Sequence, residues 1–203
     1  MPVPIEAITN PQPCNPALAQ RLAKRPSPTS LKIVPPNPSW PSQYLNLESQ
    51  IRCALPNATS IAHAGSTSVP DLPAKDCIDI DVSVADIDDE RSYVPALEGI
   101  GFLFLHREPS WHGHRFFCRA DPALQPVNLH VWPEGCAEVE RHRIFRDWLV
   151  REPADRELYA RVKREASAAA VEAGEDVEAY NVRKEATIRD ILDRAFRHLG
   201  YID

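Results

Sequence analysis

Alternating apolar and polar positions predict several short β-strands in the middle of the chain. In the clearest run, residues 77–84, every second side chain is a branched aliphatic residue. Asp79 and Asp81 fall on the opposite face, because successive side chains of a strand point to opposite sides. Shorter runs of the same kind predict strands at residues 31–34, 59–63, 102–106, 115–119 and 127–132.

Helical spacing of apolar residues appears once before these strands and dominates after Gly135. Tyr44, Leu47, Ile51 and Leu55 predict a helix over residues 43–55. Proline at a first turn and glycine after a last turn are typical of helix ends. These signals predict three further helices, at residues 137–151, 153–173 and 177–199. Strands followed by a block of helices indicate an α+β fold with a helical C-terminal third.

The start of the chain has a different composition. Eleven of the twenty prolines fall within the first 41 residues, and this stretch has no glycine. Because proline removes a backbone donor, residues 1–30 are expected to form neither a helix nor a central strand. We interpret them as a proline-rich N-terminal arm, either a disordered extension or an ordered lid over the rest. Residues 31–203 are then one domain.

Composition narrows the functional classes. The formal net charge of −6 argues against a protein that grips nucleic acid through its overall charge. The five cysteines are scattered without a C-x-x-C pair, which indicates reduced thiols rather than a disulfide framework or a zinc site. No run of 18 apolar residues and no signal-peptide pattern occurs. We therefore expect a cytoplasmic protein without a membrane segment, and we infer no obligate protein partner.

A glycine followed by three hydroxyl residues, Gly65, Ser66, Thr67 and Ser68, comes directly after a predicted strand. Such a tight turn can direct backbone N–H groups and side-chain oxygens towards an anion such as phosphate. Short Gly-Ser turns are common, so this signal alone is weak.

The spacing of Asp79 and Asp81 strengthens the evidence for a functional site near this turn. Two carboxylates separated by one strand residue project to the same side, with Cβ atoms about 7 Å apart. They can bracket a cation. The plainer alternative is that one aspartate caps a neighbouring element while the other meets solvent. Ionised carboxylates in an apolar strand are costly unless they are paired or bound to metal, which favours function here.

Several longer motifs occur along the chain. They are His-Ala-Gly-Ser-Thr-Ser-Val-Pro at 63–70, Leu72, Ala-Lys at 74–75, Ile-Asp-Ile-Asp-Val at 78–82, Asn-Leu-His-Val at 128–131, Phe-Arg-Asp-Trp-Leu at 145–149, and Tyr180 with Lys184. In this order and spacing, from about Leu31 to the C-terminus, they resemble the GrpB family. The resemblance implies a nucleotidyltransferase-like fold, a twisted mixed β-sheet flanked by helices. In that fold a glycine-serine turn holds a triphosphate and acidic residues hold magnesium.

Carried over by position, Gly65 and Ser66 are the phosphate turn, and Asp79 and Asp81 bind Mg²⁺. His63 and Lys75 flank the cleft. The wider superfamily takes a third acid from a later strand, and this chain has Asn128 and His130 there. Asp71 and Asp76 stand where the family usually has glycine and proline, and both add negative charge to the loop.

Other polar residues remain candidates. Asn128 and His130 share a face of an apolar strand, so His130 is either a core histidine or a cleft histidine. His112 and His114 resemble a metal pair but are more typical of surface histidines. Arg141, Arg143 and Arg146 form either a solvated helix face or a phosphate anchor. Tyr180 and Lys184 are spaced to meet on one helix face.

Three functions compete on these residues. The first is a Mg²⁺-dependent nucleotidyl or phosphoryl transferase with a nucleotide substrate, in which Asp79, Asp81, Ser66 and His130 are the catalytic candidates. The second is aminoacyl transfer from aminoacyl-tRNA, because fungal proteins resembling the family are associated with arginine-containing cyclodipeptides. There the aspartates would pair with a guanidinium. The third is a binding module that has lost the reaction.

Overall fold

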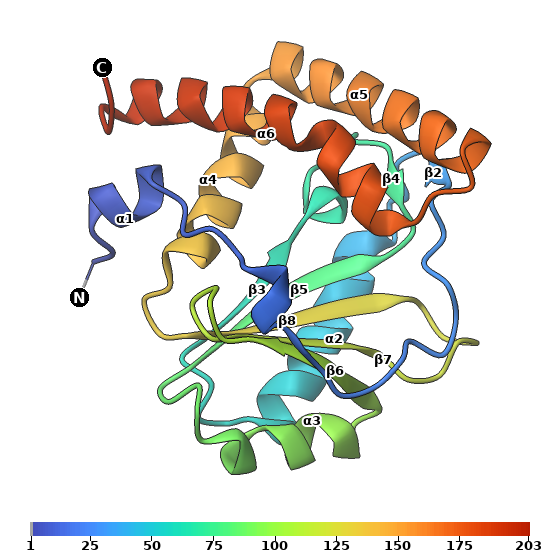
Figure 1. Ribbon diagram of the computed structural model, residues 1–203, viewed down its shortest axis with the longest axis vertical. Coiled ribbons are helices and arrows are strands. Elements are labelled where there is room, and N and C mark those ends of the chain that lie inside the picture. The colour runs from blue at the N-terminus through green and yellow to red at the C-terminus, as the bar shows by residue number, and fades with distance from the viewer. Residues whose placement is uncertain (1) are drawn as a thin grey trace.

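The computed structural model describes residues 2–203 (Figure 1). The helices are α1 (Ile5–Thr9), α2 (Trp40–Ala54), α3 (Val94–Gly99), α4 (Ala137–Arg151), α5 (Pro153–Glu172) and α6 (Val177–Leu199). The strands are β1 (Gln20–Arg21), β2 (Ile33–Val34), β3 (Ser60–Ala64), β4 (Ala74–Lys75), β5 (Ile78–Val84), β6 (Phe102–Glu108), β7 (His114–Arg119) and β8 (Val127–Pro133).

Six strands form one mixed sheet in the order β1-β6-β7-β8-β5-β3. Among these neighbours only β5 and β8 are parallel, and every other neighbouring pair is antiparallel. β2 and β4 make a separate two-stranded ribbon. Helices lie on both sides of this sheet (Figure 1), which confirms the predicted α+β class with a twisted mixed sheet flanked by helices.

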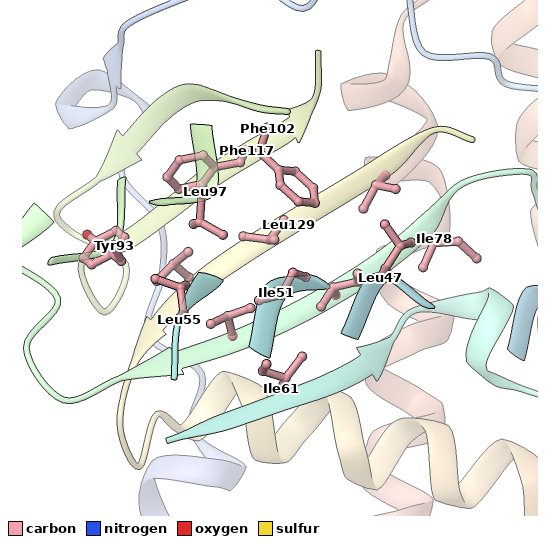
Figure 2. Packing of buried hydrophobic residues seen from close by; sticks show 14 of the residues in the cluster. Leu47, Ile51, Leu55, Ile61, Ile78, Tyr93, Leu97, Phe102, Phe117 and Leu129 are labelled. Carbon is pink, nitrogen blue, oxygen red and sulfur yellow. The ribbon is translucent and has the colours of Figure 1, made fainter. Parts of the chain in front are cut away.

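The apolar face of the sheet holds the main core. Ile78 and Ile80 of β5 and Leu129 of β8 are fully buried there, against Ile51 of α2 and Leu97 of α3 (Figure 2). Alternation along β5 and β8 sends their polar residues to the opposite face. The sequence pattern of these two strands therefore decides where polar chemistry can occur.

α4, α5 and α6 gather over that opposite face (Figure 1). Their apolar stripes bury one another in two smaller clusters, in which Leu149, Ile191 and Phe196 are almost completely inaccessible. Asp176 is the N-cap of α6, and its side chain accepts hydrogen bonds from two backbone N–H groups. Gly200, in the left-handed conformation, is the C-cap. The C-terminal helices thus form a second layer above the polar side of the sheet.

The N-terminal arm packs onto this body. The expectation that residues 1–30 form no helix is wrong for Ile5–Thr9, a single short turn that follows Pro4. Ile8 is 3% exposed and contacts the cluster formed by α4 and α6. Gln20 and Arg21 add a two-residue edge strand to β6. Proline tolerates a first helical turn and an edge strand, which explains why this composition still gives structure.

The element bounds follow the sequence pattern closely. α4 and α6 have the predicted bounds, and α5 ends one residue earlier than predicted. The short elements α3, β1 and β4 have no pattern long enough to predict them. Among residues 2–203, no helix is both long and apolar enough to cross a membrane.

Candidate functional site

A cleft of about 820 Å³ lies between the polar face of the sheet and helices α5 and α6. The parallel strands β5 and β8 form its floor, and the glycine-serine turn closes one side. Nine of the residues singled out in the sequence line it: Gly65, Ser66, Thr67, Lys75, Asp79, Asn128, His130, Tyr180 and Lys184.

Gly65 begins the turn and is held in a conformation that favours glycine. Its φ is 65° and its ψ −168°, a region of backbone space that L side chains rarely occupy. A Cβ at this position would also lie 2.9 Å from the Cβ of Asp79 and overlap its carboxylate. The turn is therefore pressed against Asp79, and Ser66 follows directly at the cleft wall.

His63 and Ser68 support the turn instead of lining the cleft. His63 Nε2 lies 2.9 Å from the Thr67 hydroxyl, and its ring stacks on Tyr44 with centroids 4.5 Å apart. Burial, with a smaller contribution from Arg146, lowers the pKa of His63 to about 4, so its ring is neutral. Ser68 Oγ donates to the Gly65 carbonyl at 2.5 Å.

Asp79 is the carboxylate that faces the cleft. Its Oδ1 accepts a hydrogen bond from Asn128 Nδ2 at 2.7 Å. Asn128 Oδ1 in turn accepts from Nη2 of Arg25, a residue of the N-terminal arm, also at 2.7 Å. Burial raises the pKa of Asp79, although Asn128 and the nearby lysines counteract part of this rise. The arm thus reaches the floor of the cleft.

Asp81 lies deeper and is already paired. It is 1% exposed, Oδ1 accepts from Trp132 Nε1 at 2.9 Å, and Oδ2 accepts from His142 Nδ1 at 2.8 Å. Burial raises the pKa of Asp81, but His142 has the larger combined effect and holds that pKa below its ordinary value. Burial alone would lower the pKa of His142, yet Asp81 raises it to about 9. His142 is therefore an imidazolium at neutral pH.

The two aspartates fit a magnesium ion poorly in this arrangement. Both oxygens of Asp81 accept hydrogen bonds, and one of them meets a cation that the chain itself supplies. Within residues 2–203, no three His, Cys, Asp or Glu side chains gather as a metal site. Magnesium prefers several oxygen ligands in octahedral geometry. The metal role of Asp79 and Asp81 stays a prediction.

Three lysines dominate the charge of the cleft. Lys75 and Lys184 place their Nζ atoms 4.8 Å and 4.7 Å from the centre of the Tyr180 ring. Lys163 is 2% exposed, and its Nζ donates to the Pro73 carbonyl at 2.7 Å. Burial and mutual repulsion lower the pKa of Lys75 and Lys163, and burial lowers that of Lys184 to about 8. Asp79 is the carboxylate that raises the pKa of all three lysines and so offsets part of this effect.

Arg141 lines a different space. It borders a smaller cavity of about 230 Å³. Residues that line both this cavity and the cleft include Gly65, Ser66, His142 and Tyr159. Its Nη1 donates to the Ile8 carbonyl at 2.5 Å, so it anchors the N-terminal arm.

The acids of the preceding loop lie outside the cleft. Asp71 has a positive φ of 62°, which explains why glycine suits that position. Asp76 accepts hydrogen bonds from Trp40 and Gln125. Neither acid lines the lysine-containing cleft, so neither adds negative charge to its wall.

The residues of the cleft that sequence reasoning misses include Arg25, His142, Tyr159 and Lys163. Lys163 has a usable signal, because it falls on the same helical face as Tyr159 and Ala170, which are buried. His142 stands between two arginines in the sequence, so it resembles part of a basic cluster. Arg25 carries no signal, since the arm has no periodic pattern.

Comparisons with known proteins agree with this architecture. The family model described as GrpB protein matches residues 30–194. A UPF0157 protein of Halalkalibacterium halodurans is 40% identical over 172 residues, covering 84% of this chain and 85% of the relative. A dephospho-CoA kinase of Mycolicibacterium paratuberculosis is 30% identical over 192 residues, and the match covers 46% of that kinase. The crystal structure of the conserved protein GrpB from Enterococcus faecalis superposes with a TM-score of 0.71 at 25% identity, covering 83% of this chain and 99% of that one. The chain belongs to the GrpB family.

Proposed function

We propose that this protein is a transferase that binds the phosphates of a nucleotide-containing substrate in the lysine-containing cleft. The observation that carries the proposal is the convergence of Lys75, Lys163 and Lys184 beside the Gly65-Ser66 turn. These lysines bind the phosphate oxygens, and the turn supplies further donors. Nucleotidyl or phosphoryl transfer is the reaction class that such a site serves best.

The charge balance supports an anionic ligand. Burying a cation without a partner is costly, and the lowered pKa of each lysine expresses that cost. Asp79 offsets only part of the positive charge, and the His142 imidazolium adds to it. A bound polyphosphate would neutralise the group. This local charge is opposite in sign to the net charge of the chain, −6.

Similarity to a known fold and to named relatives also supports the proposed transferase function. The family resembles the nucleotidyltransferase fold, in which a glycine-serine turn and adjacent acids hold a nucleotide. The mycobacterial relatives carry the name dephospho-CoA kinase, which denotes phosphoryl transfer to a nucleotide-containing acceptor. This chain spans about half the length of those relatives, so their activity bears on it only as a proposal.

Recognition of arginine by the two aspartates, as in cyclodipeptide synthesis, has less support. Asp81 is occupied by Trp132 and His142, so the pair cannot offer two free carboxylates to a guanidinium. Asp79 lies with three lysines in the cleft, whose other acids are Glu178 and Glu185 of α6, and the nearby lysines disfavour a further cation at Asp79. The geometry therefore favours phosphate over guanidinium.

The proposal is tested by calorimetric titration with ATP, once with Mg²⁺ and once with EDTA. We expect ATP to bind the wild type in both buffers and to bind Lys184→Met at least tenfold more weakly. Arg161→Met is the control, because Arg161 lies on α5, is 64% exposed and pairs with Glu165, and neither residue lines the cleft. Absent ATP binding, or equal binding by wild type and Lys184→Met, contradicts the proposal.

A further inference from the structure

A buried chain of hydrogen bonds runs from Glu108 through His114 to His130. His114 Nδ1 lies 2.6 Å from Glu108 Oε2, and His114 Nε2 lies 2.9 Å from His130 Nδ1. His114 is 2% exposed and stacks on Trp132 with ring centroids 4.1 Å apart. Both imidazoles are therefore fixed in orientation, and His130, the last member, lines the cleft.

The proton positions follow from the chemistry of each partner. Burial raises the pKa of Glu108, but the hydrogen bond from His114 and the nearby His106, 3.7 Å away, hold that pKa below its ordinary value, so the carboxylate only accepts. His114 must donate from Nδ1, and because burial lowers its pKa it is neutral and carries a lone pair on Nε2. His130 must then donate from Nδ1 to that lone pair. A neutral imidazole has one proton, so His130 keeps a lone pair on Nε2.

The free nitrogen of His130 faces the cleft. Among residues 2–203, His130 Nε2 makes no hydrogen bond with the protein, and it is not one of the buried polar atoms that lack a partner, so solvent reaches it. Burial lowers the pKa of His130 to about 3, so its ring is neutral at pH 7, and the titratable groups that act on it are His114, Asp81, His142 and Glu108. Because so weak a base holds a proton poorly, its hydrogen bond to His114, which can take the proton on, matters to its role. His130 thus presents an acceptor on the same floor as Asp79.

We propose that His130 is the general base of the transfer reaction and that His114 and Glu108 are positioning residues that fix its tautomer. The inference rests on the proposed function, since the acceptor is a hydroxyl group or water attacking the bound nucleotide. Nε2 takes the acceptor proton while the new O–P bond forms. The P–O bond to the leaving group breaks, which is pyrophosphate in nucleotidyl transfer and the nucleoside diphosphate in phosphoryl transfer, and that group departs with the bonding electrons as an anion.

The positive charge that comes with this proton moves from His130 to His114, away from the cleft. As Nε2 of His130 is protonated, its Nδ1 proton passes to Nε2 of His114. The result is a neutral His130 in the other tautomer and an imidazolium at His114, paired with the Glu108 carboxylate. Buried charge is tolerated when it is paired and hydrogen-bonded, so this arrangement makes a relay feasible through a buried histidine.

Nitrogen-15 NMR of the histidine side chains tests the inference without any ligand. Tautomers are distinguished by the chemical shifts of the two ring nitrogens, and single His114→Gln and His130→Gln variants assign the signals. We expect both histidines of the wild type to be neutral and protonated on Nδ1 at pH 7. His130 protonated on Nε2, or doubly protonated, overturns the inference.

Glu108→Gln tests the positioning role. A glutamine can accept from His114 Nδ1 or donate to it, so we expect His130 to become a mixture of tautomers. Glu98→Gln, at an exposed position on α3, is the control and leaves the wild-type tautomers unchanged. A folded Glu108→Gln variant with an unchanged His130 tautomer overturns the role of Glu108. Failure of ATP to bind would remove the proposed function but leave these spectra as expected, so the two failures are distinguishable.

Discussion

His142 Nδ1 and Asp81 Oδ2 lie 2.8 Å apart, in an ion pair between the first turns of α4 and the middle of β5. The pair joins the helical layer to the polar face of the sheet. It also removes Asp81 from the open cleft, so the Asp-x-Asp motif supplies one facing carboxylate, Asp79, instead of two. His142 retains its other nitrogen for the cleft and the smaller cavity, both of which it lines.

Asp81→Asn is expected to lower the pKa of His142 well below 9, because burial then acts without the carboxylate that outweighs it. Proton-detected NMR titration of His142 measures this. Asp79→Asn is the matched control and should lower the pKa of His142 much less, because Asp79 makes the smallest of the contributions that raise it. A pKa that stays near 9 in Asp81→Asn would show that another group holds the imidazolium.

The same pair links stability to pH. The pKa of His142 is raised in the folded state, so its contribution is complete below about pH 6.5 and is lost as the pH rises through 9. The free energy of unfolding of the wild type should therefore exceed that of Asp81→Asn at pH 6.5, and the gap should narrow by pH 10. Urea denaturation at both pH values checks this, and a constant gap would contradict it.

Gly65→Ala should destabilise the protein and abolish nucleotide binding. The backbone conformation alone costs about 1–3 kcal/mol for a residue with a side chain, and the new Cβ overlaps the Asp79 carboxylate. Gly99→Ala is the matched control, because nothing lies within 4 Å of the position that its Cβ would take. Thermal unfolding and ATP titration of both variants measure the effects. Equal melting temperatures for the two variants would refute the argument.

Ile8→Ala should lower the free energy of unfolding by about 2 kcal/mol, as expected when a buried isoleucine is truncated. Ile8 is 3% exposed and packs against α4 and α6, whereas Ile5 is 46% exposed. Ile5→Ala should therefore change stability by less than about 0.5 kcal/mol. Chemical denaturation of both variants tests whether the arm is part of the folded body. Equal effects would mean that α1 does not stay docked.

Lys184→Met should be more stable than the wild type near pH 7 without ligand. The pKa of Lys184 falls to about 8 in the folded protein, so its buried charge opposes folding below pH 8. The free energy of unfolding of the wild type should therefore rise relative to that of the variant between about pH 8 and 10.5, as Lys184 loses its charge. Denaturation at pH 7.5 and pH 10 gives the comparison, and a destabilised variant at pH 7.5 would argue against a buried lysine that opposes folding.

The sequence predicts most of this fold because β5, β8 and the C-terminal helices have long, regular apolar patterns. The alternation in β5 places Asp79 and Asp81 on the polar face correctly. It cannot distinguish their environments, because the difference comes from Trp132 and His142, which lie far along the chain. The sequence favours a surface position for His114, and the structure buries it at the start of β7, where Glu108 satisfies it.

The lysine group shows the same limit. The family motifs predict Lys75 and Lys184 at the cleft, and the structure places both there. The buried face of α5 indicates that Lys163 is enclosed, but its place beside the other two lysines depends on the packing of α5 against α6 and on its hydrogen bond to the Pro73 carbonyl, which no local pattern predicts. Arg25 reaches Asn128 through an arm whose composition indicates little structure. Long-range contacts of single side chains are the part that sequence reasoning could not supply.

The most direct test of the phosphate-binding cleft is an NMR titration of the Lys184 ammonium group, with and without ATP. We predict a pKa of about 8 in the free protein, rising above the ordinary lysine value of about 10.4 when ATP is bound, because a phosphate beside the ammonium group favours its charged form. ATP binding that leaves the pKa of Lys184 unchanged would place the nucleotide elsewhere and contradict the account.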